Sequence, residues 1–171
     1  MDYYDFCAAL TVGHFVKTSI IIPLIYCIWF SFKALVGTCP TTWTALEGSC
    51  IKLWNQSLTW SAANSLCEEF GSKLAVINSE AKNQAISAIL STDKAWIGLY
   101  RDPKNHANWL WVDGSRLSYT NWGTDQPGNT EGCVVIYSKS GDWHDYPCAD
   151  EKREIPSFYC ETFGKYLSYL P

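Results

Sequence analysis

The stretch AWIGLYRDPKNHANWLWVDG, residues 95–114, carries the strongest fold signals of this 171-residue chain. Its first six residues form a short, uncharged and largely apolar run, which predicts a buried strand. Its second half places Trp109 and Trp111 just before Asp113-Gly114, a pair typical of a tight turn. We therefore expect a buried strand followed by an apolar segment that ends in a turn.

Two helices are predicted before this stretch. In residues 58–71, Thr59 is a suitable N-cap and Gly71 suits the position just after the helix. The apolar residues that share one face of this helix are Ala63, Leu66, Cys67 and Phe70. A second helix is expected to begin after Asn78 or Ser79. Its apolar positions are Ile86, Ile89 and Leu90.

Short strands are predicted in the rest of the chain. Residues 39–53 place two β-branched runs around Glu47-Gly48, which indicates a hairpin. The runs CVVIY, residues 133–137, and SFYCE, residues 157–161, predict two further strands. Because the helices come early and the strands late, the order favours an α+β domain with helices beside an antiparallel sheet.

Composition excludes several classes of protein. Hydrophobic residues make up 47% of the chain and charged residues 18%, so we expect a packed core and no extensive disorder. The net charge of −4 argues against a nucleic-acid partner, which usually requires a basic face. The chain has no G-x-S-x-G, H-E-x-x-H or P-loop motif, and we expect no enzymatic activity.

The chain has eight cysteines, and the six from Cys39 onward fall in what reads as one domain. None forms a C-x-x-C pair, which disfavours a zinc ribbon or a thioredoxin-like redox site. A disulfide between Cys39 and Cys50 would clip the predicted hairpin, but six cysteines allow many pairings. Since disulfides persist in oxidising compartments, we expect residues 39–171 to lie outside the cytosol.

Residues 1–38 predict a segment of a different kind. Residues 18–32 (TSIIIPLIYCIWFSF) carry no charge and lie between Lys17 and Lys33. A secretory signal that is cleaved near Gly37 and an uncleaved signal-anchor helix are both possible, and we favour the cleaved signal. Only the anchor would make this a single-pass membrane protein. The sequon Asn55-Gln56-Ser57 is compatible with either route.

Together these features resemble the C-type lectin-like domain family, over roughly Cys39 to Glu161. The shared motifs are WIGL at 96–99, WLWVDG at 109–114 and YTNW at 119–122, together with the placement of six cysteines. The resemblance implies an α+β fold with two helices flanking short antiparallel sheets and a long irregular ligand-binding loop region. We therefore expect three segments: a leader or anchor at residues 1–38, the domain at 39–162 and a tail at 163–171. The resemblance also implies the disulfides Cys39–Cys50, Cys67–Cys160 and Cys133–Cys148.

The resemblance further implies a calcium site in the loop region. Family members that bind sugar hold calcium there, and two adjacent hydroxyls of a monosaccharide complete its coordination. The ligands come from an E-P-N or Q-P-D triplet, a Glu two residues before a cysteine, and a W-N-D triplet. The matching positions here are Gln126-Pro127-Gly128, Glu131 and Trp143-His144-Asp145. The implied calcium ligands are Gln126, Asn129, Glu131 and Asp145, and the implied sugar contacts are the same four residues with His144.

Two departures from the family pattern weaken this site. Gly128 supplies no side-chain oxygen where the family has Asn or Asp, although Asn129 could take that place. His144 replaces an Asn, and an imidazole nitrogen suits calcium poorly. We therefore expect any calcium binding to be weak.

Two functions follow from the sequence. The leading hypothesis is a secreted C-type lectin that binds galactose-like or related terminal sugars of glycans or glycoproteins with calcium, in innate recognition. The galactose class is suggested by Gln126, because galactose-type members carry Gln at this position. The alternative is a calcium-independent domain of the same fold that binds a protein or another surface such as ice. No coiled-coil or collagen-like stretch indicates an oligomer.

Overall fold

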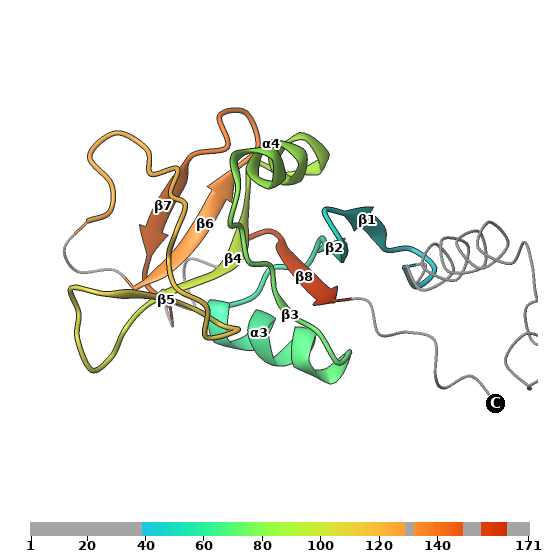
Figure 1. Cartoon of the computed structure of the whole chain (residues 1–171), viewed down its shortest axis with the longest axis horizontal. Helices are drawn as coiled ribbons and strands as arrows, with labels where there is room; N and C mark the ends of the chain where they lie inside the picture. The colour runs from blue at the N-terminus through green and yellow to red at the C-terminus, as the bar shows by residue number, and fades with distance from the viewer. Residues whose placement is uncertain (1–38, 129–131, 149–154, 164–171) are drawn as a thin grey trace, which may run out of the picture. The chain divides into compact units, whose positions relative to one another are not determined.

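The computed structural model describes residues 39–128, 132–148 and 155–163 (Figure 1). The predicted signal or anchor segment, residues 1–38, lies outside these ranges, as do residues 164–171 of the predicted tail, 163–171. Phe163, where we expected the tail to begin, is the last residue of the strand Phe158–Phe163. Within the described ranges, no helix is both long and apolar enough to cross a membrane.

The described chain forms two helices and one eight-stranded sheet, which confirms the α+β prediction. The strands are β1 (Thr44–Leu46), β2 (Ser49–Trp54), β3 (Lys73–Leu74), β4 (Lys94–Arg101), β5 (Trp109–Trp111), β6 (Cys133–Tyr137), β7 (Trp143–Tyr146) and β8 (Phe158–Phe163). The helices are α3 (Trp60–Glu69) and α4 (Glu80–Ile89). The sheet has the order β1-β2-β8-β4-β6-β7, with β3 also paired to β8 and β5 to β4. The pairing of β4 with β8 is parallel, where we predicted antiparallel strands alone.

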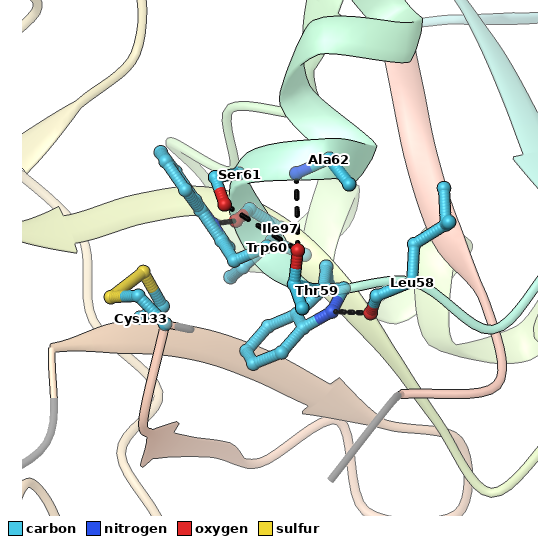
Figure 2. Close-up of a disulfide and its surroundings, with 9 residues drawn as sticks. Leu58, Thr59, Trp60, Ser61, Ala62, Ile97 and Cys133 are labelled. Carbon is cyan, nitrogen blue, oxygen red and sulfur yellow. Dashed lines mark hydrogen bonds between the residues drawn. A yellow bond between two sulfur atoms is a disulfide. The ribbon is translucent and has the colours of Figure 1, made fainter. Parts of the chain in front are cut away.

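Local signals in the sequence explain the helix ends and the first hairpin. The hydroxyl of Thr59 accepts a hydrogen bond from the backbone N–H of Ala62 at 3.3 Å, as an N-cap does (Figure 2). Ser79 caps α4 in the same way, through the backbone N–H of Lys82. In the hairpin between β1 and β2, Glu47 and Gly48 both have positive φ, at 45° and 80°, the geometry that a tight two-residue turn requires.

One prediction for the first helix is wrong. Phe70 was assigned to the buried face, but it is 49% exposed. Helix α3 ends at Glu69, so Phe70 no longer follows the helical period. Its ring stacks on Trp54, at the end of β2, with centroids 5.0 Å apart. Gly71 follows with φ of 64°, a conformation that glycine adopts without strain, as predicted for the position after a helix.

The three predicted disulfides are all present: Cys39–Cys50, Cys67–Cys160 and Cys133–Cys148. Cys67–Cys160 joins α3 to β8 across 93 residues. A cross-link over a loop of that length stabilises the fold by about 4–5 kcal/mol in the chain-entropy picture. Figure 2 shows the disulfide of Cys133 together with the first turn of α3, and both belong to one apolar cluster.

The hydrophobic core has two parts because successive residues of a strand point to opposite faces of the sheet. In β4, Ile97 and Leu99 pack with α4, whereas Trp96 packs with α3. The fully buried aromatic side chains are Trp96, Trp111, Trp143, Phe158 and Tyr159. In Figure 1, α3 and α4 are seen with β4 and β8 between them.

A buried ion pair that the sequence did not reveal joins α4 to β8. Lys82 and Glu161 are both 3% exposed, and the ammonium of Lys82 donates to Glu161 Oε1 at 2.5 Å. The second carboxylate oxygen, Oε2, accepts a hydrogen bond from the backbone N–H of Val76 at 2.8 Å. Each charge is therefore paired, as a buried charge must be.

Replacing Lys82 with Met is expected to lower the free energy of unfolding by about 3–5 kcal/mol, because Glu161 is then buried without its cation. Urea unfolding of the full chain, followed by tryptophan fluorescence, measures this loss. The control is Lys104→Met, at an exposed position, which should change the same quantity by less than about 0.5 kcal/mol. Equal stability of Lys82→Met and the parent would show that the pair does not stabilise the fold.

Candidate functional site

The candidate site lies where the loop of residues 122–128, here named the Pro127 loop, meets β7 and the end of β4. The predicted ligand positions Gln126 and Asp145 both belong to this region, and the Gln126–Pro127 peptide bond is cis. Asn129 and Glu131 lie outside the described residues, so their predicted roles remain predictions.

The Trp143-His144-Asp145 triplet is part of a strand, which we did not predict. β7 pairs antiparallel with β6, so that Val134 lies opposite Asp145 and Val135 opposite His144. Strand alternation puts Trp143 and Asp145 on one face and His144 on the other. His144 packs instead against the ring of Tyr137, with centroids 4.7 Å apart. The structure therefore separates His144 from the side chain of Asp145.

Asp145 is the centre of a dense set of hydrogen bonds. Its carboxylate is fully buried. Oδ1 accepts from the backbone N–H of Gly128 at 2.6 Å, and Oδ2 accepts from Arg101 Nη2 at 3.3 Å. Its backbone N–H donates to Gln126 Oε1 at 3.2 Å. Both ends of the Gln126-Pro127-Gly128 triplet are thus fastened to one residue of β7.

Arg101 belongs to the candidate site but was not among the residues that the sequence predicted for it. It is the last residue of β4, and its guanidinium connects three segments. Nη2 donates to the carbonyl of Gly128 at 2.6 Å, and Nη1 donates to the carbonyl of His106 at 2.8 Å. The guanidinium also lies 4.4 Å from the ring centroid of Trp109. The charged residue that follows WIGLY was visible in the sequence, but its partner 44 residues away was not.

Aromatic side chains and two asparagines form the base of the site. The indole N–H of Trp143 donates to Asn83 Oδ1 on α4 at 2.8 Å. The amide groups of Asn83 and Asn121 both donate to the carbonyl of Gly141, at 3.0 and 2.9 Å. The rings that meet Trp143 edge-on are Tyr119, Trp111 and Trp122. The site therefore rests on a rigid support anchored to α4.

A second polar cluster occupies the other face of β7. The hydroxyls of Tyr137 and Tyr146 lie 2.9 Å apart, and Lys94 donates to Tyr146 at 3.1 Å. Burial, and then the hydrogen bond with Tyr146, raise the pKa of Tyr137 to about 12. Burial and a hydrogen bond to Glu80 also raise the pKa of Tyr119, at the base of the site.

The described residues do not fit a calcium ion. Calcium needs six to eight oxygen ligands, several of them usually carboxylates. Both oxygens of Asp145 are engaged, one of them by a cation, and the oxygen of Gln126 already accepts a hydrogen bond. Among the residues that the structure describes, no group of three or more His, Cys, Asp or Glu side chains could hold a metal ion.

Comparisons with known proteins all point to one family. The Lectin C-type domain family matches residues 56–161. Lectin BRA-2 of Megabalanus rosa is 34% identical over 125 residues, which cover 72% of this chain and 69% of that lectin.

Solved structures agree with this result. The carbohydrate-recognition domain of cow CD23, crystallised in the presence of a GlcNAc2Man3 oligosaccharide, matches with a TM-score of 0.69 and 26% identity. That match covers 75% of this chain and 98% of the cow domain. A calcium-independent type II antifreeze protein matches with a TM-score of 0.66 and 25% identity, over 74% of this chain and 95% of its own.

Replacing Asn83 with Ala is expected to loosen the base of the site. The indole N–H of Trp143 would lose its acceptor, which should lower the free energy of unfolding by about 1–3 kcal/mol. Near-UV circular dichroism should also lose intensity, since Trp143 and its neighbouring rings would be held less firmly. The matched control is Gln84→Ala, at the next, exposed position of α4. An unchanged spectrum and unchanged stability would contradict the support role of Asn83.

Proposed function

The chain belongs to the C-type lectin domain family, and from that premise we propose that it binds glycans at the Pro127 loop and β7. The lectins among its relatives and the cow domain crystallised with an oligosaccharide support this proposal. The family consists of binding domains, and the proposal includes no catalytic step.

The observation that carries the proposal is the fastening of the Gln126-Pro127-Gly128 triplet to Asp145. Gln126 is half-buried, and its side-chain oxygen is held by the backbone of Asp145. This arrangement orients the amide –NH2 group of Gln126, which can donate hydrogen bonds to sugar hydroxyls. A loop ordered in advance loses less conformational entropy when a ligand binds. The proposed site is therefore pre-organised around Gln126.

The finer details of the site are part of the same proposal. Asn129 and Glu131, which follow Gln126 in the chain, would add polar groups for sugar hydroxyls. Asp145 would act by holding the loop, because its own carboxylate is buried. The side chain of His144 points to the opposite face of β7 from that of Asp145, but its imidazole lies against Gly123 of the Pro127 loop, so we keep its predicted contact with sugar in the proposal. We propose galactose-like sugars because Gln126 matches the galactose-type triplet of the family.

A second candidate function is calcium-independent binding of a protein or another surface. Gly128, which offers no side-chain oxygen, and the Arg101–Asp145 ion pair favour it over a calcium-dependent mode. The similarity to a calcium-independent antifreeze protein is compatible with this candidate. Calcium-dependent sugar binding would require Asn129 and Glu131 to supply most of the ligands.

We also propose that the domain works outside the cytosol. Three disulfides hold the described residues together, and such bonds persist in oxidising compartments. Secretion after removal of a signal is the simplest route, and mass spectrometry of the mature N-terminus distinguishes it from retention of an anchor.

The full chain is expected to be retained on galactose resin and to elute with free galactose. Gln126→Ala should weaken binding by about threefold to tenfold, the effect of losing one hydrogen bond. Glycan affinity is measured by isothermal titration or on an array. The control is Gln84→Ala, at an exposed position of α4, which should bind as the parent does.

Each arm of this experiment is run with calcium and with EDTA. Retention that disappears in EDTA would support the calcium-dependent form of the proposal. Retention that persists in EDTA would support calcium-independent glycan binding. Failure to bind galactose, mannose or any arrayed glycan under both conditions would overturn the glycan proposal in favour of the second candidate.

A further inference from the structure

We propose that the guanidinium of Arg101 is the resident cation of the Pro127 loop and gives the loop its shape without a metal ion. The proposal concerns how the loop is held, so it does not depend on which ligand the loop binds. Arg101 is a positioning residue in this proposal and acts through Asp145 and Gly128.

The charge of Asp145 is the first reason. Its carboxylate is fully buried, and an unpaired buried carboxylate would cost several kcal/mol. The side chain that neutralises it is Arg101, itself only 16% exposed, at an Nη2–Oδ2 distance of 3.3 Å. The guanidinium of Arg101 therefore already supplies the positive charge that the buried carboxylate of Asp145 requires.

The set of oxygens around Arg101 is the second reason. The guanidinium gathers one carboxylate oxygen, from Asp145, and two backbone carbonyl oxygens, from His106 and Gly128. Carboxylates and carbonyls are the same kinds of ligand that calcium gathers. The planar fork of arginine suits this task because its donors point in several fixed directions.

The anchoring of Arg101 is the third reason. Its backbone N–H donates to the carbonyl of Gly132 at 2.7 Å, and its guanidinium lies over the ring of Trp109. Cation–π contact and the end of a central strand therefore fix the charge in place. Calcium could reach Asp145 only by displacing a side chain that holds contacts with several other segments.

The test compares the melting temperature of the full chain in about 5 mM calcium chloride with that in about 5 mM EDTA. This calcium concentration is above the dissociation constants of the weakest extracellular calcium sites, which are about 1 mM. For the parent we expect a difference below about 1 °C. Arg101→Ala should melt roughly 10 °C lower in EDTA, because a buried charge loses its partner. Calcium should then recover at least about 2 °C in this variant, since Asp145 and the carbonyl of Gly128 are exposed to a replacement cation.

Three further variants separate this role from a purely structural one. Arg116→Ala, at an exposed position, should behave as the parent does. Arg101→Lys keeps the charge, so it should melt between the parent and Arg101→Ala without a calcium response. In Arg101→Ala/Asp145→Asn the buried charge is absent, so the calcium response should disappear.

Two results would overturn the proposal. One is a parent protein that calcium stabilises by more than about 2 °C, because a metal would then hold the loop. The other is a fall in the melting temperature of Arg101→Ala with no calcium response, which would make Arg101 an ordinary packing residue. If Arg101→Ala does not fold, the comparison is made with Arg101→Gln, which removes the charge but keeps a hydrogen-bond donor. Calcium should raise the melting temperature of this variant by at least about 2 °C, and a lowered melting temperature without a calcium response would again overturn the proposal. Loss of glycan binding alone would concern the proposed function and leave this proposal intact.

Asn55 carries a second, independent inference: we propose that it bears an N-linked glycan. Asn55-Gln56-Ser57 is the only N-x-Ser/Thr sequon in the chain. All three residues are exposed and lie in an irregular segment between β2 and α3. The side-chain oxygen of Asn55 accepts a hydrogen bond from Ser91 at 3.3 Å, and this bond uses the atom that glycosylation leaves unchanged.

The modification is transfer of an oligosaccharide from a polyprenyl-diphosphate donor. The bond between C1 of the first sugar and the diphosphate oxygen breaks, and Asn55 Nδ2 forms the new bond to C1. The diphosphate leaves with the electron pair, and Nδ2 loses one proton.

The position of Asn55 keeps such a glycan away from the candidate site. Its partner Ser91 precedes β4, whereas Arg101 ends that strand. A strand of this length spans roughly 25 Å. The glycan would therefore leave the Pro127 loop accessible.

The test uses the full chain secreted from a eukaryotic host. Peptide-N-glycosidase F should increase its gel mobility and convert Asn55 to Asp in the tryptic peptide. Asn55→Gln should remove the shift, whereas Asn105→Gln, another exposed asparagine, should retain it. Secreted protein whose Asn55 peptide is unmodified, or a chain that never enters the secretory pathway, would overturn this inference.

Discussion

The fold depends on the insertion of its last strand, β8, between strands from the beginning and the middle of the chain. β8 pairs with β2 on one side and with β4 on the other. Cys160 ties the strand to α3, and Glu161 ties it to α4 through Lys82. These contacts join residues 79 and 93 positions apart, so neither helix can pack fully before β8 is in place. On its far side, β8 lies beside β4, whose other edge pairs with β6.

β4 connects the centre of the sheet to the candidate site. Arg101 ends this strand, and β6 and β7 extend the sheet beyond it. The Pro127 loop has little secondary structure of its own and is held by side chains: Arg101 and Asp145 at its end, and Trp122 against Trp143 at its beginning. Loops that are held by a stable scaffold in this way are where binding functions usually reside. The entropy of ordering the loop is then largely lost on folding, before any ligand arrives.

The sequence predicted the features that depend on local chemistry. Thr59, Gly71 and Glu47-Gly48 set the helix and hairpin ends through backbone preferences that neighbours barely influence. The disulfide pairing required the resemblance to a family, because spacing alone left many alternatives. The strand at Trp143–Tyr146 was missed because its polar His144 and Asp145 interrupt the apolar pattern that marks a buried strand. Lys82–Glu161 and Arg101–Asp145 could not be predicted, since charged side chains normally face solvent and only the folded chain brings these partners together.

A tethered guanidinium and an exchangeable calcium ion would give the loop different properties. The stabilisation by an exchangeable ion depends on its free concentration relative to its dissociation constant, so the loop would loosen wherever the ion is scarce. A guanidinium that is part of β4 is present at a fixed, high local concentration, and the loop stays ordered at any calcium level. The guanidinium is less able than a calcium ion to bind a sugar directly. A calcium ion can accept sugar hydroxyls into its coordination shell, whereas the guanidinium of Arg101 has its donors directed to protein oxygens and to the face of Trp109. Selectivity at this loop must then come from hydrogen bonds of the side chains around it, and Gln126, whose oxygen is fixed and whose amide can donate, is the residue best placed to supply them.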